Sequence, residues 1–147
     1  MIRLLYFSQA VATVTNADLE EILATSRRKN KERDITGALV TGGGVFLQIL
    51  EGPEQSVLSL YLEILQDSRH YDVEIMRVTP IINRLFEDWS MECFETTPLQ
   101  FEQIIKFKTE HFALEEPTEF IGALRGLVDV LREPKLAAPG AASSQLR

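Results

Sequence analysis

The 147-residue sequence contains little cysteine, no long apolar run and no excess of positive charge. Its one cysteine, Cys93, has no partner for an internal disulfide and no ligand cluster nearby for zinc or iron–sulfur, so we expect a small buried residue. No apolar stretch approaches the roughly 20 residues that cross a bilayer. The net charge of -7 argues against nucleic-acid backbones and anionic lipid as partners, because both require clustered cations. We therefore expect neither a membrane nor a nucleic-acid partner.

Both ends of the chain also lack features that would change this expectation. The first ten residues have no secretory signal, because polar Ser8 and Gln9 interrupt the apolar stretch early, so we expect a cytoplasmic protein. Residues 133–147 are rich in alanine, proline, glycine and serine, which is typical of a disordered tail. We expect no output domain after them.

What the sequence does contain is a repeated strand–helix–strand pattern. Apolar runs predict strands over residues 2–9, 35–40, 45–50, 73–81 and 89–94. Amphipathic spacing predicts one helix from an Asn16 cap to about Asp34, and a second helix after Pro53. The glycines at 42–44 suit a tight hairpin turn. The order β-α-β-β-α-β-β predicts an α+β, ferredoxin-like fold with two helices on one face of the sheet.

Two more amphipathic helices are predicted over residues 98–112 and 117–131. They either fold back on the open face of the sheet or pair with another subunit, and their apolar faces favour a homo-oligomer. The predicted organisation is a domain over 1–97, a helical extension over 98–132 and a tail over 133–147.

Two polar side chains fall inside predicted strands. Gln48 lies in an apolar run, so its amide is expected to be buried and to need partners. Tyr6 lies in the first strand, which neighbours the strand of Gln48 in a ferredoxin-like order, so the two could meet across the sheet. A structural glutamine and a core tyrosine are the alternatives. Asn30 could cap a helix end, and Trp89 and Met91, predicted on one face of the last strand, could be core filler.

Taken together, these segments resemble the BLUF family of flavin-dependent blue-light sensors over about residues 1–97. The matching motifs stand in the family's order, and the third is the most diagnostic: RLLYFSQ at 3–9, Ser26 through Asn30 to Gly37, FLQILEG at 46–52, DSRH at 67–70 and FEDWSM at 86–91.

The resemblance implies a non-covalent flavin between the two helices, normally FAD, with FMN or riboflavin as alternatives. It implies Tyr6 and Gln48 as the photoactive pair, Trp89 and Met91 as the relay, no catalytic residue and no metal. The flavin contacts that it implies are Tyr6, Ser8, Ile22, Ser26, Lys29, Asn30, Gln48, Leu50, Asp67, Arg69 and His70. Lys29 and Glu63 depart from residue types common in the family at those positions.

The resemblance also implies a receptor that is not an enzyme and whose signal is read by a separate downstream effector protein. One rival is a cofactor-free ferredoxin-like interaction module in which Tyr6 and Gln48 only pack. The other is a flavin-dependent oxidoreductase, although a Rossmann-type glycine fingerprint after a strand is missing.

Overall fold

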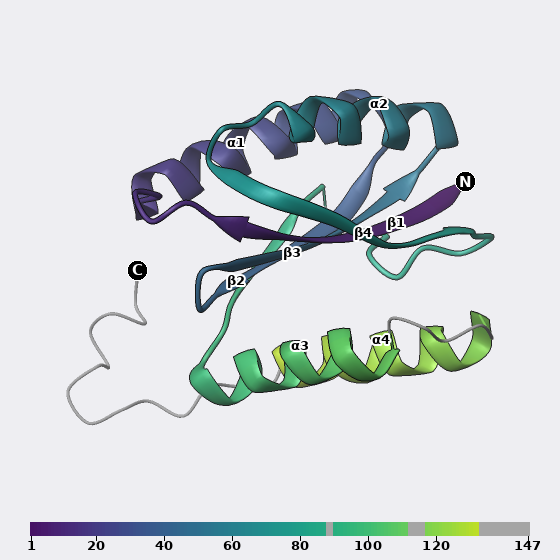
Figure 1. The fold of residues 1–147 in the computed structure, drawn as a ribbon. Helices are drawn as coiled ribbons and strands as arrows, with labels where there is room; N and C mark the ends of the chain where they lie inside the picture. Colours follow the sequence, from purple (N-terminus) through teal and green to yellow (C-terminus); the bar gives the residue numbers. More distant parts are fainter. Residues whose placement is uncertain (88–89, 112–116, 133–147) are drawn as a thin grey trace.

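The computed structural model describes residues 1–87, 90–111 and 117–132 (Figure 1). Along the chain, its helices and strands are β1 (Ile2–Ala10), α1 (Asn16–Glu32), β2 (Thr36–Gly42), β3 (Val45–Gly52), α2 (Glu54–Leu65), β4 (His70–Pro80), β5 (Glu92–Glu95), α3 (Pro98–His111) and α4 (Pro117–Arg132). None of the helices in this described part has the length and hydropathy of a membrane span.

The described strands form one five-stranded sheet in the order β4-β1-β3-β2-β5. β1 lies antiparallel between β4 and β3, β2 is antiparallel to β3, and β5 is parallel to β2. The arrangement confirms the predicted α+β, ferredoxin-like fold and the predicted contact between the first and third strands. The hairpin turn between β2 and β3 contains Gly43 and Gly44 at φ of 58° and 77°, a region that glycine adopts without steric cost.

The sheet is covered on both faces. Figure 1 shows α1 and α2 packed on one face and α3 and α4 on the other. Side chains alternate along β1, so Leu4 and Tyr6 join the core under α1 and α2, whereas Leu5 and Phe7 join the core against α3 and α4. Each face of the sheet therefore has its own apolar core.

The two C-terminal helices fold back on the sheet rather than leaving it open. Ile104 and Phe107 of α3 and Leu124 and Leu127 of α4 are buried in the core beneath the sheet. Burying these side chains removes them from water, which explains why the helices dock. Because these apolar faces are buried against the sheet, they no longer argue for a homo-oligomer, which stays a prediction. The division of the chain into a domain, a helical extension and a tail at residues 97 and 132 also stays a prediction.

The predicted cap of the first helix is wrong by one residue. Thr15, not Asn16, is the N-cap: its hydroxyl accepts from the Asp18 backbone N–H at 3.1 Å, and the Asp18 carboxylate accepts from the Thr15 backbone N–H at 2.9 Å. This reciprocal pair satisfies two backbone donors that the first turn of a helix leaves free.

The last strand and the segment before it differ from prediction. β5 begins at Glu92, because α1 side chains bind the backbone carbonyls of Ser90 and Met91 in place of a strand partner. Trp89 lies outside the described residues, as does the predicted tail. Cys93 is half-buried rather than buried, since β5 is an edge strand.

The segment between β4 and β5 is irregular at residues 84–86. The chain bends there, and the backbone N–H groups of Leu85 and Phe86 both donate to the buried carboxylate of Glu51. That carboxylate also forms an ion pair with buried Arg3 at 2.8 Å. Glu51 therefore ties the segment after β4 to the centre of the sheet.

Candidate functional site

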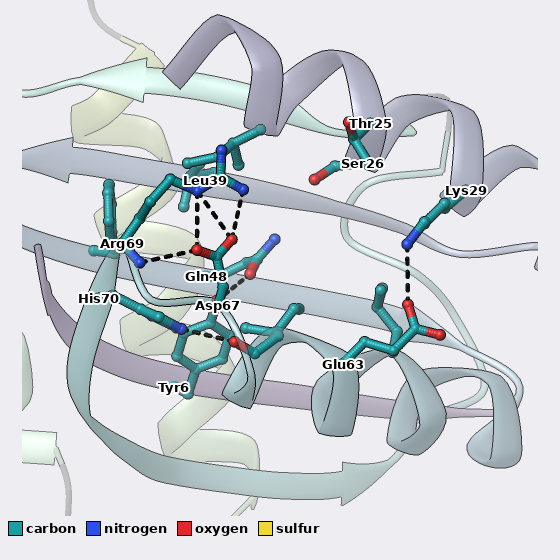
Figure 2. Close-up of a pocket in the computed structure, with 14 residues that line it drawn as sticks. Tyr6, Thr25, Ser26, Lys29, Leu39, Gln48, Glu63, Asp67, Arg69 and His70 are labelled. Carbon is teal, nitrogen blue, oxygen red and sulfur yellow. Dashed lines mark hydrogen bonds and ion pairs between the residues drawn. The ribbon is translucent and has the colours of Figure 1, made fainter. Parts of the chain in front are cut away.

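A cavity of about 180 Å³ lies between α1, α2 and the sheet (Figure 2). Its lining combines apolar side chains with polar and charged ones. The residues that line it are Tyr6, Ile22, Thr25, Ser26, Lys29, Leu39, Phe46, Gln48, Leu60, Glu63, Ile64, Asp67, Arg69 and His70. A cavity in which apolar walls meet converging polar groups is a common form of small-molecule site.

Tyr6 and Gln48 lie at the buried side of this cavity. They are register partners across β1 and β3, and the Tyr6 hydroxyl donates a hydrogen bond to Gln48 Oε1. Both residues are buried. Burial raises the pKa of Tyr6 far above its ordinary value, and Tyr61 and Asp67 raise it further, so the phenol keeps its proton. The pair is a neutral donor and acceptor closed off from water.

The other end of the Gln48 amide faces Met91. Gln48 Nε2 donates to Met91 Sδ at 3.7 Å, and Met91 is buried just before β5. A thioether sulfur is a weak acceptor, whereas a phenol is a good donor. The amide is therefore held firmly at its oxygen and weakly at its nitrogen.

α1 holds the segment that leads into β5. Asn30 Nδ2 donates to the Ser90 carbonyl at 2.5 Å, and Arg27 Nε donates to the Met91 carbonyl at 3.1 Å. Asn30 is fully buried, and its Oδ1 has no hydrogen-bond partner among the described residues. A buried acceptor without a donor is costly, so a ligand with an N–H group would fit here.

His70 is oriented by hydrogen bonds at both ring nitrogens. Nε2 lies 2.8 Å from the Ile64 carbonyl, which can only accept, so Nε2 carries a proton. Nδ1 lies 2.8 Å from Ser8 Oγ, which donates to it when the ring is neutral. Ser8 therefore does not line the cavity itself but fixes the ring that does.

Two sets of ion pairs line the cavity, with Asp67 and Arg69 near Gln48 and with Lys29 and Glu63 on the side away from it (Figure 2). Asp67 binds Arg69 at 2.6 Å, and hydrogen bonds from the Arg69 side chain hold the pKa of the Asp67 carboxyl below its usual range. Glu63 of α2 binds Lys29 of α1 at 3.2 Å and Arg33, the C-cap residue that follows α1, at 2.7 Å. The Arg33 hydrogen bond is the main reason that the pKa of Glu63 is also lowered.

Most residues that the resemblance implies as flavin contacts line the cavity, but three do not. Ser8 acts through His70, Asn30 is buried beside Ser90, and Leu50 is fully buried in the core between the sheet and the upper helices. The structure adds lining residues that the resemblance did not supply: Thr25, Leu39, Phe46, Leu60, Glu63 and Ile64. Helical spacing along 22–29 and 60–64 could have indicated most of them, because residues three and four apart share a face.

The family model described as "BLUF: Sensors of blue-light using FAD" matches residues 1–92 of this chain. This chain belongs to the BLUF family. As a BLUF domain, the matched segment is a flavin-binding photosensory module rather than a catalytic domain. Membership argues against both rivals, the cofactor-free module and the oxidoreductase.

Relatives with curated functions share this BLUF segment. Subunit beta of a photoactivated adenylate cyclase of Euglena gracilis is 40% identical over 89 residues, which cover 60% of this chain and 10% of that protein. The blue light- and temperature-regulated antirepressor BluF of Escherichia coli (strain K12) is 38% identical over 77 residues, covering 52% of this chain and 19% of that protein. This chain thus spans about a tenth of the first and a fifth of the second.

Solved BLUF structures are similar over nearly the whole chain. The dark-state structure of the BLUF protein BlrB has a TM-score of 0.72 at 27% identity, covering 88% of this chain and 95% of that one. The photo-activated state of BlsA has a TM-score of 0.72 at 26% identity, covering 93% and 99%. The similarity therefore extends beyond the BLUF segment into the C-terminal helices.

Proposed function

We propose that this chain is a blue-light receptor that holds FAD non-covalently between α1 and α2 and changes state at the Tyr6–Gln48 hydrogen bond. The observation that carries the proposal is that hydrogen bond itself. It joins a protonated phenol, at the buried side of the cavity, to an amide whose donor and acceptor ends can exchange places by rotation. The family description names FAD, while FMN and riboflavin share the same ring.

The residues present fit a flavin. Flat apolar ring faces match the apolar walls formed by Ile22, Leu39 and Leu60. The ring edge displays carbonyls and an N–H group: Gln48 Nε2, which lines the cavity, would donate to a carbonyl. Asn30 Oδ1 has no hydrogen-bond partner among the described residues and would accept from the N–H, although Asn30 itself is not among the lining residues.

A bound flavin would supply absorption of blue light and, once excited, an electron acceptor. Tyr6 Oη is the proton source, because burial keeps it protonated and its hydrogen bond aims the proton at Gln48 Oε1. Reversing the Gln48 amide exchanges its donor and acceptor ends without adding charge. The weak bond to Met91 Sδ favours this change at the nitrogen end, and no substrate is consumed.

The signal would leave the site through the segment that precedes β5. One hydrogen bond is worth about 1 kcal/mol net, whereas moving a two-state equilibrium from 1:99 to 99:1 takes about 5.5 kcal/mol. Light must therefore drive the change. Met91, together with Trp89 two residues before it in sequence, is the proposed relay toward residues 98–132, and a separate effector protein is the proposed reader.

The test is the absorption spectrum before and after blue light. We expect a yellow protein with a reversible shift to longer wavelength, retained flavin but no shift in Gln48→Leu, and a normal shift in the control Gln55→Leu, whose side chain is exposed on α2. A colourless protein would contradict flavin binding. A normal shift in Gln48→Leu would contradict the switch.

A further inference from the structure

Met91 is held at two points, by two different elements. Its carbonyl accepts a hydrogen bond from Arg27 Nε of α1 at 3.1 Å, and its Sδ accepts one from Gln48 Nε2 of β3 at 3.7 Å. The residue is buried and directly precedes β5, which begins at Glu92. Met91 is therefore the point at which α1, the Gln48 amide and the last strand meet.

The two hydrogen bonds differ in strength. A thioether sulfur is a weak acceptor, whereas a guanidinium that donates to a carbonyl forms a charge-assisted hydrogen bond, which is stronger than a neutral one. A change in the Gln48 amide can break the bond to sulfur, but it leaves the bond from Arg27 to the backbone in place. The position of the Met91 backbone therefore depends more on Arg27 than on Gln48.

Arg27 is separate from the cavity. It is not among the lining residues, and it is exposed on α1. Asn30, three residues further along the same helix face, binds the neighbouring Ser90 carbonyl at 2.5 Å, but it is fully buried and carries the unpartnered Oδ1. Changing Asn30 would disturb a buried polar group, whereas Arg27 can be changed without altering the cavity lining.

We propose that Arg27 is a positioning residue of the light-driven switch: by binding the Met91 carbonyl, it stabilises the dark-state position of the segment that enters β5 and so speeds the return to the dark state after light. The proposal rests on the receptor function and the Gln48 switch argued above. Arg27 acts through Met91 and takes no part in electron or proton transfer. Without Arg27, the segment returns more slowly, because one contact that stabilises its dark-state position is missing.

Three variants at exposed positions of α1 separate the hydrogen bond from the charge. Arg27→Met keeps an unbranched side chain but removes the donor. Arg27→Gln removes the charge but places an amide nitrogen the same number of bonds from the backbone as Arg27 Nε, so a donor remains. Arg28→Met removes the same charge from the next position of the helix, which is also exposed. Methionine, glutamine and arginine have similar helix propensities, so all three variants should fold.

The first measurement is the rate at which the spectral shift of the full 147-residue chain decays in the dark after blue light. Arg27→Met should slow this decay by about three- to tenfold, the size expected for the loss of one hydrogen bond. Arg27→Gln should stay within about twofold of the unmodified chain, because a neutral donor restores most of the bond, and Arg28→Met should not differ from it.

The second measurement is hydrogen exchange in the dark, which reports on the held segment without any photochemistry. The backbone amides of residues 90–93 should exchange about three- to tenfold faster in Arg27→Met than in the unmodified chain, because the segment opens locally more often. Neither Arg27→Gln nor Arg28→Met should reproduce this change.

The outcomes distinguish a positioning role from an effect of charge or of local packing. An unchanged decay in Arg27→Met overturns the inference and leaves the receptor function intact, even if exchange at residues 90–93 is faster, because Arg27 would then be a structural contact only. Equal slowing in Arg27→Gln or in Arg28→Met also overturns it, because the effect would follow from charge. If the unmodified chain shows no light-induced shift, the proposed function fails and the inference fails with it.

Discussion

Tyr6 and Gln48 face each other directly across the ladder between β1 and β3, and the Tyr6 hydroxyl donates to Gln48 Oε1. The nitrogen of the same amide reaches only as far as Met91 Sδ, at 3.7 Å. The amide therefore has a strong partner at its oxygen and a weak one at its nitrogen, so the nitrogen end can exchange its partner at little cost.

Tyr6→Phe should abolish the light-induced spectral shift while flavin stays bound. The substitution removes the proton source but keeps the ring that packs 5.7 Å from Tyr61. It also leaves Gln48 Oε1 without its donor, at a cost of about 1–3 kcal/mol in the free energy of unfolding. Spectra and urea unfolding measure both effects. Tyr71→Phe, at an exposed tyrosine on β4, should change neither, and a full shift in Tyr6→Phe would refute the role of Tyr6.

Met91→Leu should keep flavin but change the rate of return to the dark state by about two- to fivefold, the size expected for losing a weak hydrogen bond. It should also reduce the difference in hydrogen exchange between light and dark at β5 and α3. Met76→Leu is the control, because Met76 is buried in the core on the other face of the sheet. Identical exchange in light and dark in the unmodified chain would rule out this route for the signal.

Glu51→Gln should lower the free energy of unfolding by about 3–5 kcal/mol, because Arg3 would be left as a buried charge without a counter-ion. Adding Arg3→Met should recover part of the loss, since the uncompensated charge is removed while the glutamine oxygen still accepts from Leu85 and Phe86. Urea unfolding measures the change, with Glu95→Gln at the exposed end of β5 as control. A loss below about 1 kcal/mol would show that the pair contributes little.

The Asp67–Arg69 pair should make stability depend on pH on the acid side. Hydrogen bonds from Arg69 lower the pKa of Asp67 in the folded chain. The stabilisation is therefore fully present above the unfolded pKa of about 3.9 and is lost as the pH falls through the lower folded value. Thermal unfolding between about pH 3 and 6 should show a smaller acid loss in Asp67→Asn than in the unmodified chain. Equal acid loss in the two chains would contradict this contribution.

Several parts of the site could be predicted from sequence because local chemistry determines them. The Gln48 amide lies in an apolar run and therefore needs a hydrogen-bond partner. The alternation of side chains along a strand places Tyr6 on the same face of the sheet as that amide. Other parts could not be predicted. Asn30 and Ser90 are 60 residues apart, and their hydrogen bond depends on how α1 packs over the sheet. Arg27, Asn30 and Glu51 together decide where β5 begins, which explains why the predicted start was three residues early.

The sequence alone was enough for the strand and helix order and the glycine turn, because periodicity and φ preferences are properties of short segments. Tyr6 and Gln48 became candidates for the switch only through the resemblance of several segments to one family. Only the tertiary structure decided that α3 and α4 cover the sheet and that Glu63 bridges Lys29 and Arg33 across the cavity. An apolar helix face can be buried against its own sheet or against a partner, and a surface carboxylate can pair with any cation within reach. The choice depends on which surfaces the folded chain brings together, and no local pattern contains that information.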